Sequence, residues 1–211
     1  MIANAIGAEF RALVEREHQG KPARVVVAYR DYDTTAEDLW DALTNPERIP
    51  RWFAPVEGDL RLGGRYQVKG NAGGAITRCD PNEGFDIDWE FGGGKSWVTV
   101  RLEPKGEQTR LALEHIMWAD DADQHWKQFG PAAVGVGWDL SFLGLGLHIE
   151  TGEPVDMEGV NGWSSGDQGK AFMKASAAAW GRAHIACGED PDVASAMAAR
   201  TAAFYCGEAA P

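Results

Sequence analysis

The clearest pattern in the chain is the alternation of apolar and acidic residues over residues 85–91, which read FDIDWEF. A period of two predicts a strand with one buried face and one solvated face. Residues 98–102 and 111–115 repeat the pattern, and residues 25–29 and 59–62 also read as strands. Turn-forming clusters separate the strands at intervals of about ten residues, which predicts an antiparallel meander. The clusters are residues 63–64, 71–74, 80–84, 92–95 and 104–106.

Ahead of the meander, residues 34–55 predict two short helices that meet at an angle. Thr34 and Glu37 have the spacing of a capping box, and the apolar residues that follow fall on one helical face. Thr44 or Asn45 is expected to cap the second helix, with a proline at its first position. Two later prolines keep this helix short.

A long helix with almost no polar face is predicted over residues 135–150, and we expect it to be buried on both sides. It contains four glycines, and each costs about 1 kcal/mol relative to alanine in a helix. Gly137, Ser141 and Gly144 form a stripe of small residues. Such a stripe either lets another segment approach closely or leaves space for a ligand, and both interpretations stay open.

Both ends of the chain extend beyond these elements. In an N-terminal arm, residues 1–21, the apolar residues have helical spacing and predict a short docking helix. They are Ile6, Phe10, Leu13 and Val14. Residues 151–166 read as a flexible linker.

Two alanine-rich helices are predicted to end the chain and to cover the outer face of the 135–150 helix. The first spans residues 168–187. The second is capped by Asp190, has a proline at its first position, and carries Val193, Met197 and Phe204 on one face.

Composition narrows the classes of function. The 211 residues are 44% hydrophobic and carry a net charge of −12, which disfavours nucleic-acid binding. The chain lacks a basic cluster for a membrane surface, and Asp139 interrupts its longest apolar region. Three distant cysteines without a C-x-x-C motif indicate a reducing, cytoplasmic compartment. Charged residues precede any long apolar run, so we expect no secretory signal.

Several short segments occur in a recognisable order along the chain. They are WDALTNPE (residues 40–47), RWF (51–53), GDLRLGG (58–64), DWEF (88–91), TRLALEH (109–115) and GVGWD (135–139). This series resembles the SRPBCC superfamily of START-like and polyketide-cyclase-like proteins, and within it homologues of the activator of the Hsp-ninety ATPase. The resemblance covers residues 22–150. It implies an α+β helix-grip fold, in which a curved antiparallel sheet wraps around a long C-terminal helix, with residues 151–211 as additional C-terminal helices.

The resemblance also implies an internal pocket for a small apolar or amphipathic molecule. Flat aromatic side chains suit the walls of such a pocket, although ordinary core packing is the alternative for each of them. The residues expected to line it are Trp52, Phe53, Trp89, His115, Trp138 and Phe142.

His115 is the candidate for chemistry, because an imidazole titrates near neutrality. It either anchors a ligand or acts as a general acid or base, or it is a core histidine with satisfied ring nitrogens. We favour the core histidine, since Glu114 points to the opposite face of the strand and no other partner is visible.

Other motifs predict no site. The acids Asp86, Asp88 and Glu90 predict a solvated stripe. Residues 120–125 lack the ligand pattern of a calcium loop and predict an acidic loop or helix cap. GWSSG at residues 162–166 matches the hydrolase elbow but follows no strand. The remaining candidates, His18, His148 and His184, have no partner at metal-ligand spacing. We expect no metal and no cofactor.

Three functions stay open. The leading hypothesis is a non-catalytic protein that binds a small hydrophobic or aromatic ligand in an internal pocket. The second is a cyclase, dehydratase or hydrolase that uses His115, and the third is a chaperone-linked adaptor that acts through its surface. The ligand and the formation of a homo-oligomer are not decided by the sequence.

Overall fold

The computed structural model describes residues 8–120 and 123–209. The chain divides into two compact units. The first comprises residues up to 28, residues 119–140 and residues from 156 onwards, and the second comprises residues 29–118 and 141–155. Strand β2 (Lys21–Tyr32) and helix α3 (Ala132–Thr151) each run from one unit into the other.

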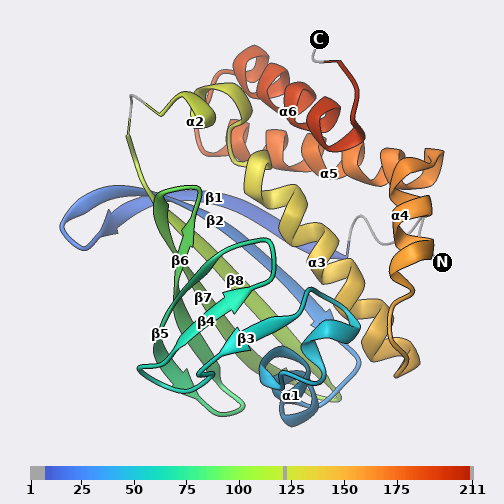
Figure 1. The fold of residues 1–211 in the computed structure, drawn as a ribbon. Coiled ribbons are helices and arrows are strands. Elements are labelled where there is room, and N and C mark those ends of the chain that lie inside the picture. The colour runs from blue at the N-terminus through green and yellow to red at the C-terminus, as the bar shows by residue number, and fades with distance from the viewer. Residues whose placement is uncertain (1–7, 121–122, 210–211) are drawn as a thin grey trace. The chain divides into compact units, whose positions relative to one another are not determined.

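Within the described residues, eight strands form one sheet in the order β1-β2-β8-β7-β6-β5-β4-β3 (Figure 1). From β3 to β8, successive strands pair antiparallel, which confirms the predicted meander. With the long helix α3 after the sheet, the chain has the α+β helix-grip fold that the sequence predicted. The other strands are β1 (Glu9–His18), β3 (Val56–Gly58), β4 (Arg65–Val68), β5 (Gly73–Asp80), β6 (Gly84–Phe91), β7 (Gly94–Lys105) and β8 (Gln108–Trp118).

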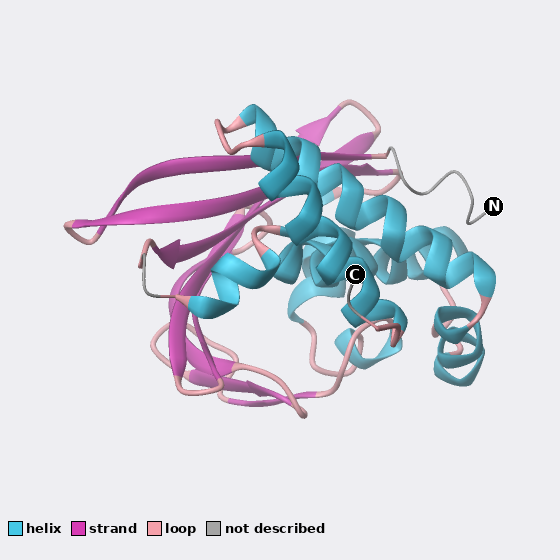
Figure 2. Ribbon diagram, turned by 90° about the horizontal axis from the view of Figure 1, so that it is seen from above, coloured by secondary structure: helices cyan, strands magenta, loops and turns pink. Residues whose placement is uncertain are grey.

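Strands β5 to β8 of the second unit span eight to twelve residues each, and the strands drawn in magenta in Figure 2 are visibly curved. The β6–β7 turn lies where it was predicted, and Gly92 and Gly93 take positive φ values there, which glycine adopts without steric cost. Leu39 of helix α1 (Ala36–Thr44), Val98 and Leu111 are almost inaccessible to solvent and belong to the core of this unit.

The cap of α1 differs from the prediction by one residue. Thr35 is the N-cap, and its hydroxyl oxygen accepts the backbone N–H of Asp38 at 3.2 Å. Thr34 instead donates its hydroxyl to the Asp38 carboxylate at 2.6 Å. The predicted capping box of Thr34 with Glu37 is therefore wrong, because the hydroxyl of Thr34 bonds to the carboxylate of Asp38.

The segment after α1 is tighter than predicted. Asn45 ends α1 as its C-cap instead of starting a second α-helix. Its side-chain oxygen accepts the N–H of Glu47 at 2.9 Å. Only a single 3₁₀ turn, η2 (Ile49–Arg51), forms before the chain extends again. We call residues 45–53 the elbow.

The strand predicted at residues 59–62 is misplaced, because β3 ends at Gly58. The N–H of Arg61 donates to the carbonyl of Asp59 at 2.9 Å, which closes a turn instead of extending the strand. Gly63 takes a positive φ in this turn, as expected of the glycine pair.

Helix α3 confirms the long apolar helix. It is long and apolar enough to cross a membrane by length and composition, a property that it shares with core helices. Val136, Phe142 and Leu145 are buried, and Asp139 and His148 are buried with them, as in a core helix.

In the first unit, residues 9–18 form strand β1 instead of the predicted docking helix. Leu13 is buried, whereas Phe10 and Val14 are exposed. This alternation is the period of a strand, and the spacing of the apolar residues matched a helix by coincidence. Ile6 lies outside the described residues.

Two C-terminal helices are present as predicted, α5 (Asp167–Ala186) and α6 (Pro191–Cys206), and Asp190 is the cap of α6. The predicted buried face of α6 is wrong in part. Met197 is buried, but Val193 and Phe204 are exposed, since small residues such as Ala194 fill the contact with α5 instead.

The predicted linker holds a further helix, α4 (Met157–Ser165), and the GWSSG motif spans the junction of α4 with α5. No strand feeds into this motif, so the described residues there do not form a hydrolase elbow.

Close packing accounts for two of the four glycines of α3. A Cβ on Gly135 would lie 2.3–2.5 Å from three atoms of the Trp180 indole in the first unit. In the second unit, a Cβ on Gly144 would lie 2.7 Å from the carbonyl oxygen of Trp52. Glycine at these positions therefore permits close approach of a neighbouring segment.

We predict that Gly135→Ala destabilises the protein by about 1–3 kcal/mol, because the buried Trp180 ring cannot move aside. Gly162→Ala in α4 is the matched control, since a Cβ there would meet nothing within 4 Å. The control should gain up to about 1 kcal/mol from helix propensity. Urea unfolding of both variants checks this, and equal effects would contradict the packing argument.

Candidate functional site

The sheet of the second unit has one face that is almost wholly apolar. Cross-strand partners lie on the same face of a sheet, and β6 pairs with β7 so that Ile87 lies opposite Val98 and Trp89 opposite Ser96. Val98 in turn lies opposite His115 of β8. We call the face that carries these five residues the apolar face.

Burial decreases across the apolar face from β8 to β6. Val98 and His115 are only 1% and 3% exposed. On β6, Ile87 and Trp89 are half-buried, and Phe91 at the strand end is 60% exposed. On β6 the apolar face therefore presents a row of apolar side chains that the protein itself covers only in part.

His115 hydrogen-bonds within this face. Its Nε2 lies 2.8 Å from the Ser96 hydroxyl oxygen, and that hydroxyl donates to the carbonyl of Trp89 at 3.1 Å. The ring of Trp89 contacts the imidazole edge to face, with centroids 6.0 Å apart. Because the Ser96 hydroxyl donates its only proton to the Trp89 carbonyl, its oxygen accepts the hydrogen bond from His115 Nε2–H. This is the reverse of a nucleophilic serine that gives its proton to a base.

Burial lowers the pKa of His115 from its ordinary value to about 4. The ring is consequently neutral at pH 7, and it is a weak general base because its conjugate acid gives up the proton about three units below neutrality. The geometry thus agrees with the core-histidine interpretation and leaves a neutral polar group on the apolar face.

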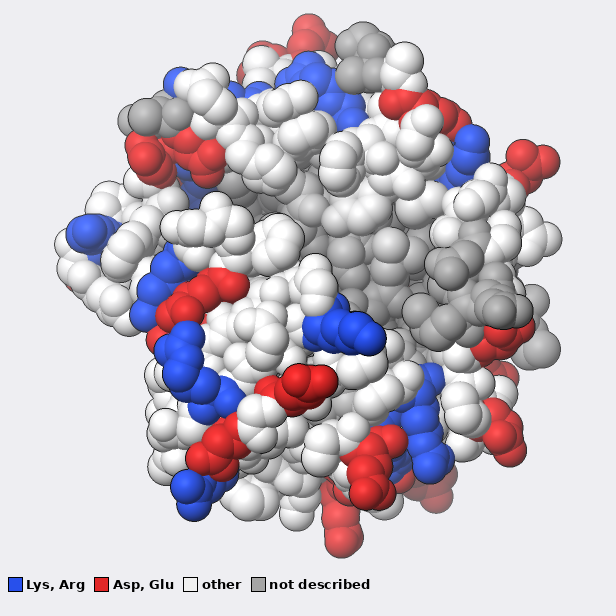
Figure 3. All heavy atoms as spheres, in the orientation of Figure 1, with Lys and Arg blue, Asp and Glu red and all other residues white. Residues whose placement is uncertain are grey.

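The opposite face of β6 carries the three acids, and each forms an ion pair. Glu90 pairs with Arg65, Asp86 with Arg101, and Asp88 with Lys95 at 2.9 Å. The prediction of a solvated stripe is wrong for Asp88, which is buried. Acidic and basic side chains also lie interspersed on the protein face that Figure 3 shows.

The remaining predicted site residues lie in different places. In the elbow, Trp52 donates its indole N–H to the carbonyl of Ala42 at 2.9 Å, and its ring lies against Phe53. Phe53 packs with Ile87 and Trp89 around a cluster of Tyr66, Val68 and Ile76. Phe142 of α3 is buried, and its carbonyl accepts the hydroxyl of Tyr32 at 3.1 Å. Trp138 belongs to the first unit.

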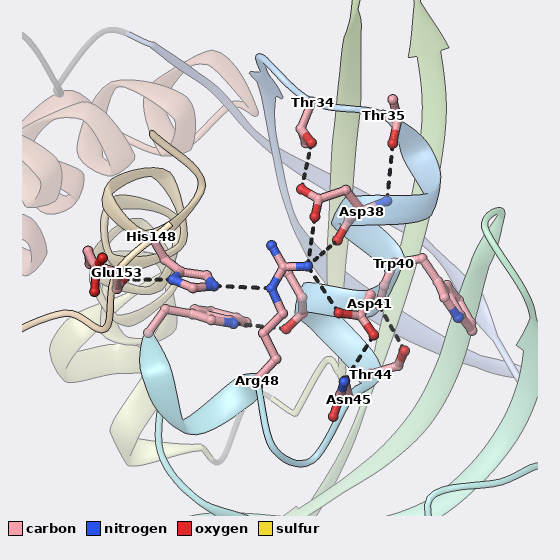
Figure 4. A network of polar contacts seen from close by, with 12 residues as sticks. Thr34, Thr35, Asp38, Trp40, Asp41, Thr44, Asn45, Arg48, His148 and Glu153 are labelled. Carbon is pink, nitrogen blue, oxygen red and sulfur yellow. Dashed lines mark hydrogen bonds and ion pairs between the residues drawn. The ribbon is translucent and has the colours of Figure 1, made fainter. Parts of the chain in front are cut away.

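A polar network that the sequence did not suggest joins the elbow to α3 (Figure 4). Arg48 donates its Nε–H to His148 Nε2 at 3.1 Å, and its Nη1 contacts the carboxylates of Asp38 at 2.7 Å and Asp41 at 3.0 Å. His148 Nδ1 lies 2.8 Å from the carbonyl of Glu153. The sequence signal was a single histidine near the end of an otherwise apolar helix.

In the first unit, Asp139 is the second buried polar residue of α3. Its Oδ2 accepts hydrogen bonds from Arg11 Nε at 2.8 Å, Ser176 Oγ at 2.5 Å and Trp180 Nε1 at 3.1 Å. Burial raises the pKa of the Asp139 carboxyl, although the positive charge of Arg11 acts to lower it. The cluster ties β1, α3 and α5 together.

Among the described residues, no group of three or more His, Cys, Asp or Glu side chains is arranged to hold a metal ion. Asp123 caps helix α2 (Gln124–Phe129) by accepting the N–H groups of His125 and Trp126. This confirms the helix-cap interpretation for Asp123, while Asp121 lies outside the described residues.

A family model described as activator of Hsp90 ATPase homolog 1-like protein matches residues 33–146, more than half of the chain. The chain belongs to this family. The matched segment begins just before α1 and ends within α3, so it includes the elbow, the apolar face and most of α3.

Solved structures agree with this assignment. The crystal structure of CalU16 from Micromonospora echinospora is 33% identical, has a TM-score of 0.63, and covers 82% of this chain and 98% of CalU16. The solution structure of CalU16 is 30% identical, has a TM-score of 0.70, and covers 85% of this chain and 97% of CalU16. MLL2253 from Mesorhizobium loti shares the fold. It is 22% identical, has a TM-score of 0.53, and covers 60% of this chain and 97% of MLL2253. In a comparison with curated proteins, none matches.

The lowered pKa of His115 predicts an acid-sensitive stability. The folded state holds the ring neutral, so its contribution to stability is complete above pH 6.5 and is lost as the pH falls towards 4. We expect His115 alone to lower the free energy of unfolding by about 2–3 kcal/mol between pH 7 and pH 4.5. Urea unfolding of wild type and His115→Gln at both pH values measures this, and equal losses in the two proteins would contradict it.

Proposed function

We propose that this protein binds a small apolar or aromatic molecule on the apolar face of the second unit and does not transform it. The single observation that carries the proposal is the partly covered row on β6, where Ile87 and Trp89 are half-buried and Phe91 is exposed. Apolar area that the fold leaves in contact with water gains free energy when a ligand covers it.

The proposed ligand lies against Trp89 and Phe91, with Phe53 from the elbow on the covered part of the same face. Phe53 packs with Trp89 in one cluster, so both side chains border the same region. The prediction that Trp52 and Phe142 also line the site remains part of the proposal, with Phe142 contributing from α3. Trp138 remains a prediction from the sequence.

His115 has a polar role in this proposal. Its neutral ring and the Ser96 hydroxyl are a polar pair on an apolar face, and such groups orient a ligand in an otherwise hydrophobic site. An enzyme that used His115 as a base would need a pKa closer to neutrality than about 4. We therefore favour binding over a cyclase, dehydratase or hydrolase activity.

The adaptor hypothesis is supported by the family description alone. A cytoplasmic location and the absence of a nucleic-acid or membrane partner remain predictions from composition.

The proposal predicts that the dye anilinonaphthalene sulfonate binds to the wild type and that Phe91→Ala weakens this binding about fivefold or more. An aromatic side chain in contact with a ligand contributes about 1 kcal/mol or more. Phe91 is mostly exposed, so its removal should leave the fold intact. A titration that follows dye fluorescence measures the affinity, and Trp89→Ala should have the larger effect.

Trp118→Ala is the matched control. Trp118 is also partly exposed and lies on the opposite face of the sheet, where its ring packs on Trp97. Equal loss of dye affinity in the Trp118 and Phe91 variants, or no loss in either, would contradict the placement of the site.

A further inference from the structure

Helix α6 of the first unit leaves one side open to solvent. Its opposite side packs on α5, where Ala194 and Ala198 lie against Gly181, and α2 contacts α6 along one flank (Figure 1). On the open side, Val193 is 42% exposed and Phe204 is 69% exposed. Apolar side chains of this size gain free energy when a partner covers them.

The exposed Phe204 belongs to a short aromatic row that continues onto α2. Its ring centroid lies 5.7 Å from that of Phe129, and the Phe129 centroid lies 5.0 Å from that of His125. The carbonyl of Phe129 accepts the hydroxyl of Thr201 at 2.9 Å, which holds the row against α6. Phe204 and Val193 are separated by about three turns of helix, so they lie on the same side of α6. The open side is therefore apolar towards both ends.

Two opposite charges lie on the same side of the helix. Asp192, Ala196 and Arg200 follow one another at intervals of four residues, which places them on one face. The two charged residues are about 12 Å apart along the axis, too far to pair with each other. Within the described part of the chain neither side chain forms an ion pair, and Arg200 makes one hydrogen bond, from Nε to the carbonyl of Gln128 at 2.7 Å.

This arrangement of charges is complementary to itself. If two copies of α6 pack antiparallel with a two-fold axis at Ala196, Asp192 of each copy lies opposite Arg200 of the other. Both pairs of opposite charges then form at once, and the antiparallel helix dipoles also attract each other. A partner of different sequence would not need charges placed symmetrically about one alanine. The pattern therefore favours a second copy of this chain over another protein.

The apolar residues fit the same symmetry. Counted from the axis, Val193 comes to lie against Ala199 of the second copy, and Phe204 comes near the turn that contains Gly188. Among the described residues no atom lies within 4 Å of the place where a Cβ of Gly188 would be, which leaves room for a ring. Ala196 at the axis is itself exposed, and a residue this small lets two helices approach to about 8 Å.

We propose that this face of α6 is the contact of a symmetric homodimer, in which Asp192 pairs with Arg200 between copies and Phe204 is covered. Helix α6 has 16 residues, and a contact of this size is smaller than a standard interface, so the association is weak. The net charge of −12 opposes it little, because charges farther apart than about 8 Å are screened at physiological ionic strength. The dimer does not depend on the proposed ligand site, since the apolar face belongs to the second unit.

Sedimentation equilibrium of the full chain tests the dimer. From about 1 μM to about 1 mM chain, we expect the wild type to shift from monomer to dimer. Asp192→Arg places arginine opposite arginine twice in the dimer and should raise the dissociation constant about tenfold or more. Asp192→Arg combined with Arg200→Glu restores two opposite-charge pairs with exchanged signs. Its dissociation constant should return to within about threefold of the wild-type value.

Glu37→Arg is the matched control. It makes the same change of charge in the first turn of another helix, α1 of the second unit, and should leave the dissociation constant within about twofold of wild type. Phe204→Ala should weaken the dimer about threefold or more, because it removes apolar area that the second copy covers. Far-UV circular dichroism checks that the helices of every variant remain.

Three results would overturn the proposal. The first is a wild type that stays monomeric over the whole concentration range. The second is a dimer that is equally strong in the wild type and in Asp192→Arg, which would assign the contact to another face. The third is a double variant no stronger than Asp192→Arg, which would exclude the pairing with Arg200.

Discussion

Helix α3 completely buries two polar side chains, and the need to give each a hydrogen-bond partner determines what packs against each half of the helix. Asp139 receives Arg11 Nε–H in the first unit, and His148 receives Arg48 Nε–H in the second. A buried polar group without a partner costs about 1–3 kcal/mol, and a buried charge costs more. The arginines, one on β1 and one in the elbow, are therefore held in place by the helix, and the segments that carry them are held too.

In the second unit this constraint leads to the proposed site. The elbow is fastened at Arg48 and again where Gly144 admits the carbonyl of Trp52. Phe53 of the elbow packs against the same cluster of Tyr66, Val68 and Ile76 as Ile87 and Trp89 do, while Phe91 at the end of β6 stays exposed. A row of apolar side chains on β6 that is half-buried at Ile87 and Trp89 and exposed at Phe91 is the arrangement from which we infer ligand binding. His115, neutral and hydrogen-bonded to Ser96, contributes polarity to this face but little capacity for proton transfer.

Local patterns predicted much of the fold. The alternation in residues 85–91, the turn glycines and helix α6 with its Asp190 cap were correct because short-range sterics and a single buried face decide them. The cap of α1 and the prediction for β1 were wrong: Thr35 replaced Thr34 as the cap, and the apolar spacing in residues 6–14 fits a helix as well as a strand. The site was harder to predict. The Arg48–His148 pair joins residues a hundred positions apart, and nothing near either residue in the sequence marks the other. The burial of Asp88 likewise depends on neighbouring strands.

The central claim is that the apolar face of the second unit holds a small molecule. Native mass spectrometry of the protein purified from its own host tests it most directly, with the same sample measured after denaturation. We predict a native mass that exceeds that of the polypeptide by one small apolar or aromatic molecule, an excess that disappears on denaturation and is reduced in Phe91→Ala. A native mass equal to that of the polypeptide, together with no small molecule in the denatured extract, would contradict the account.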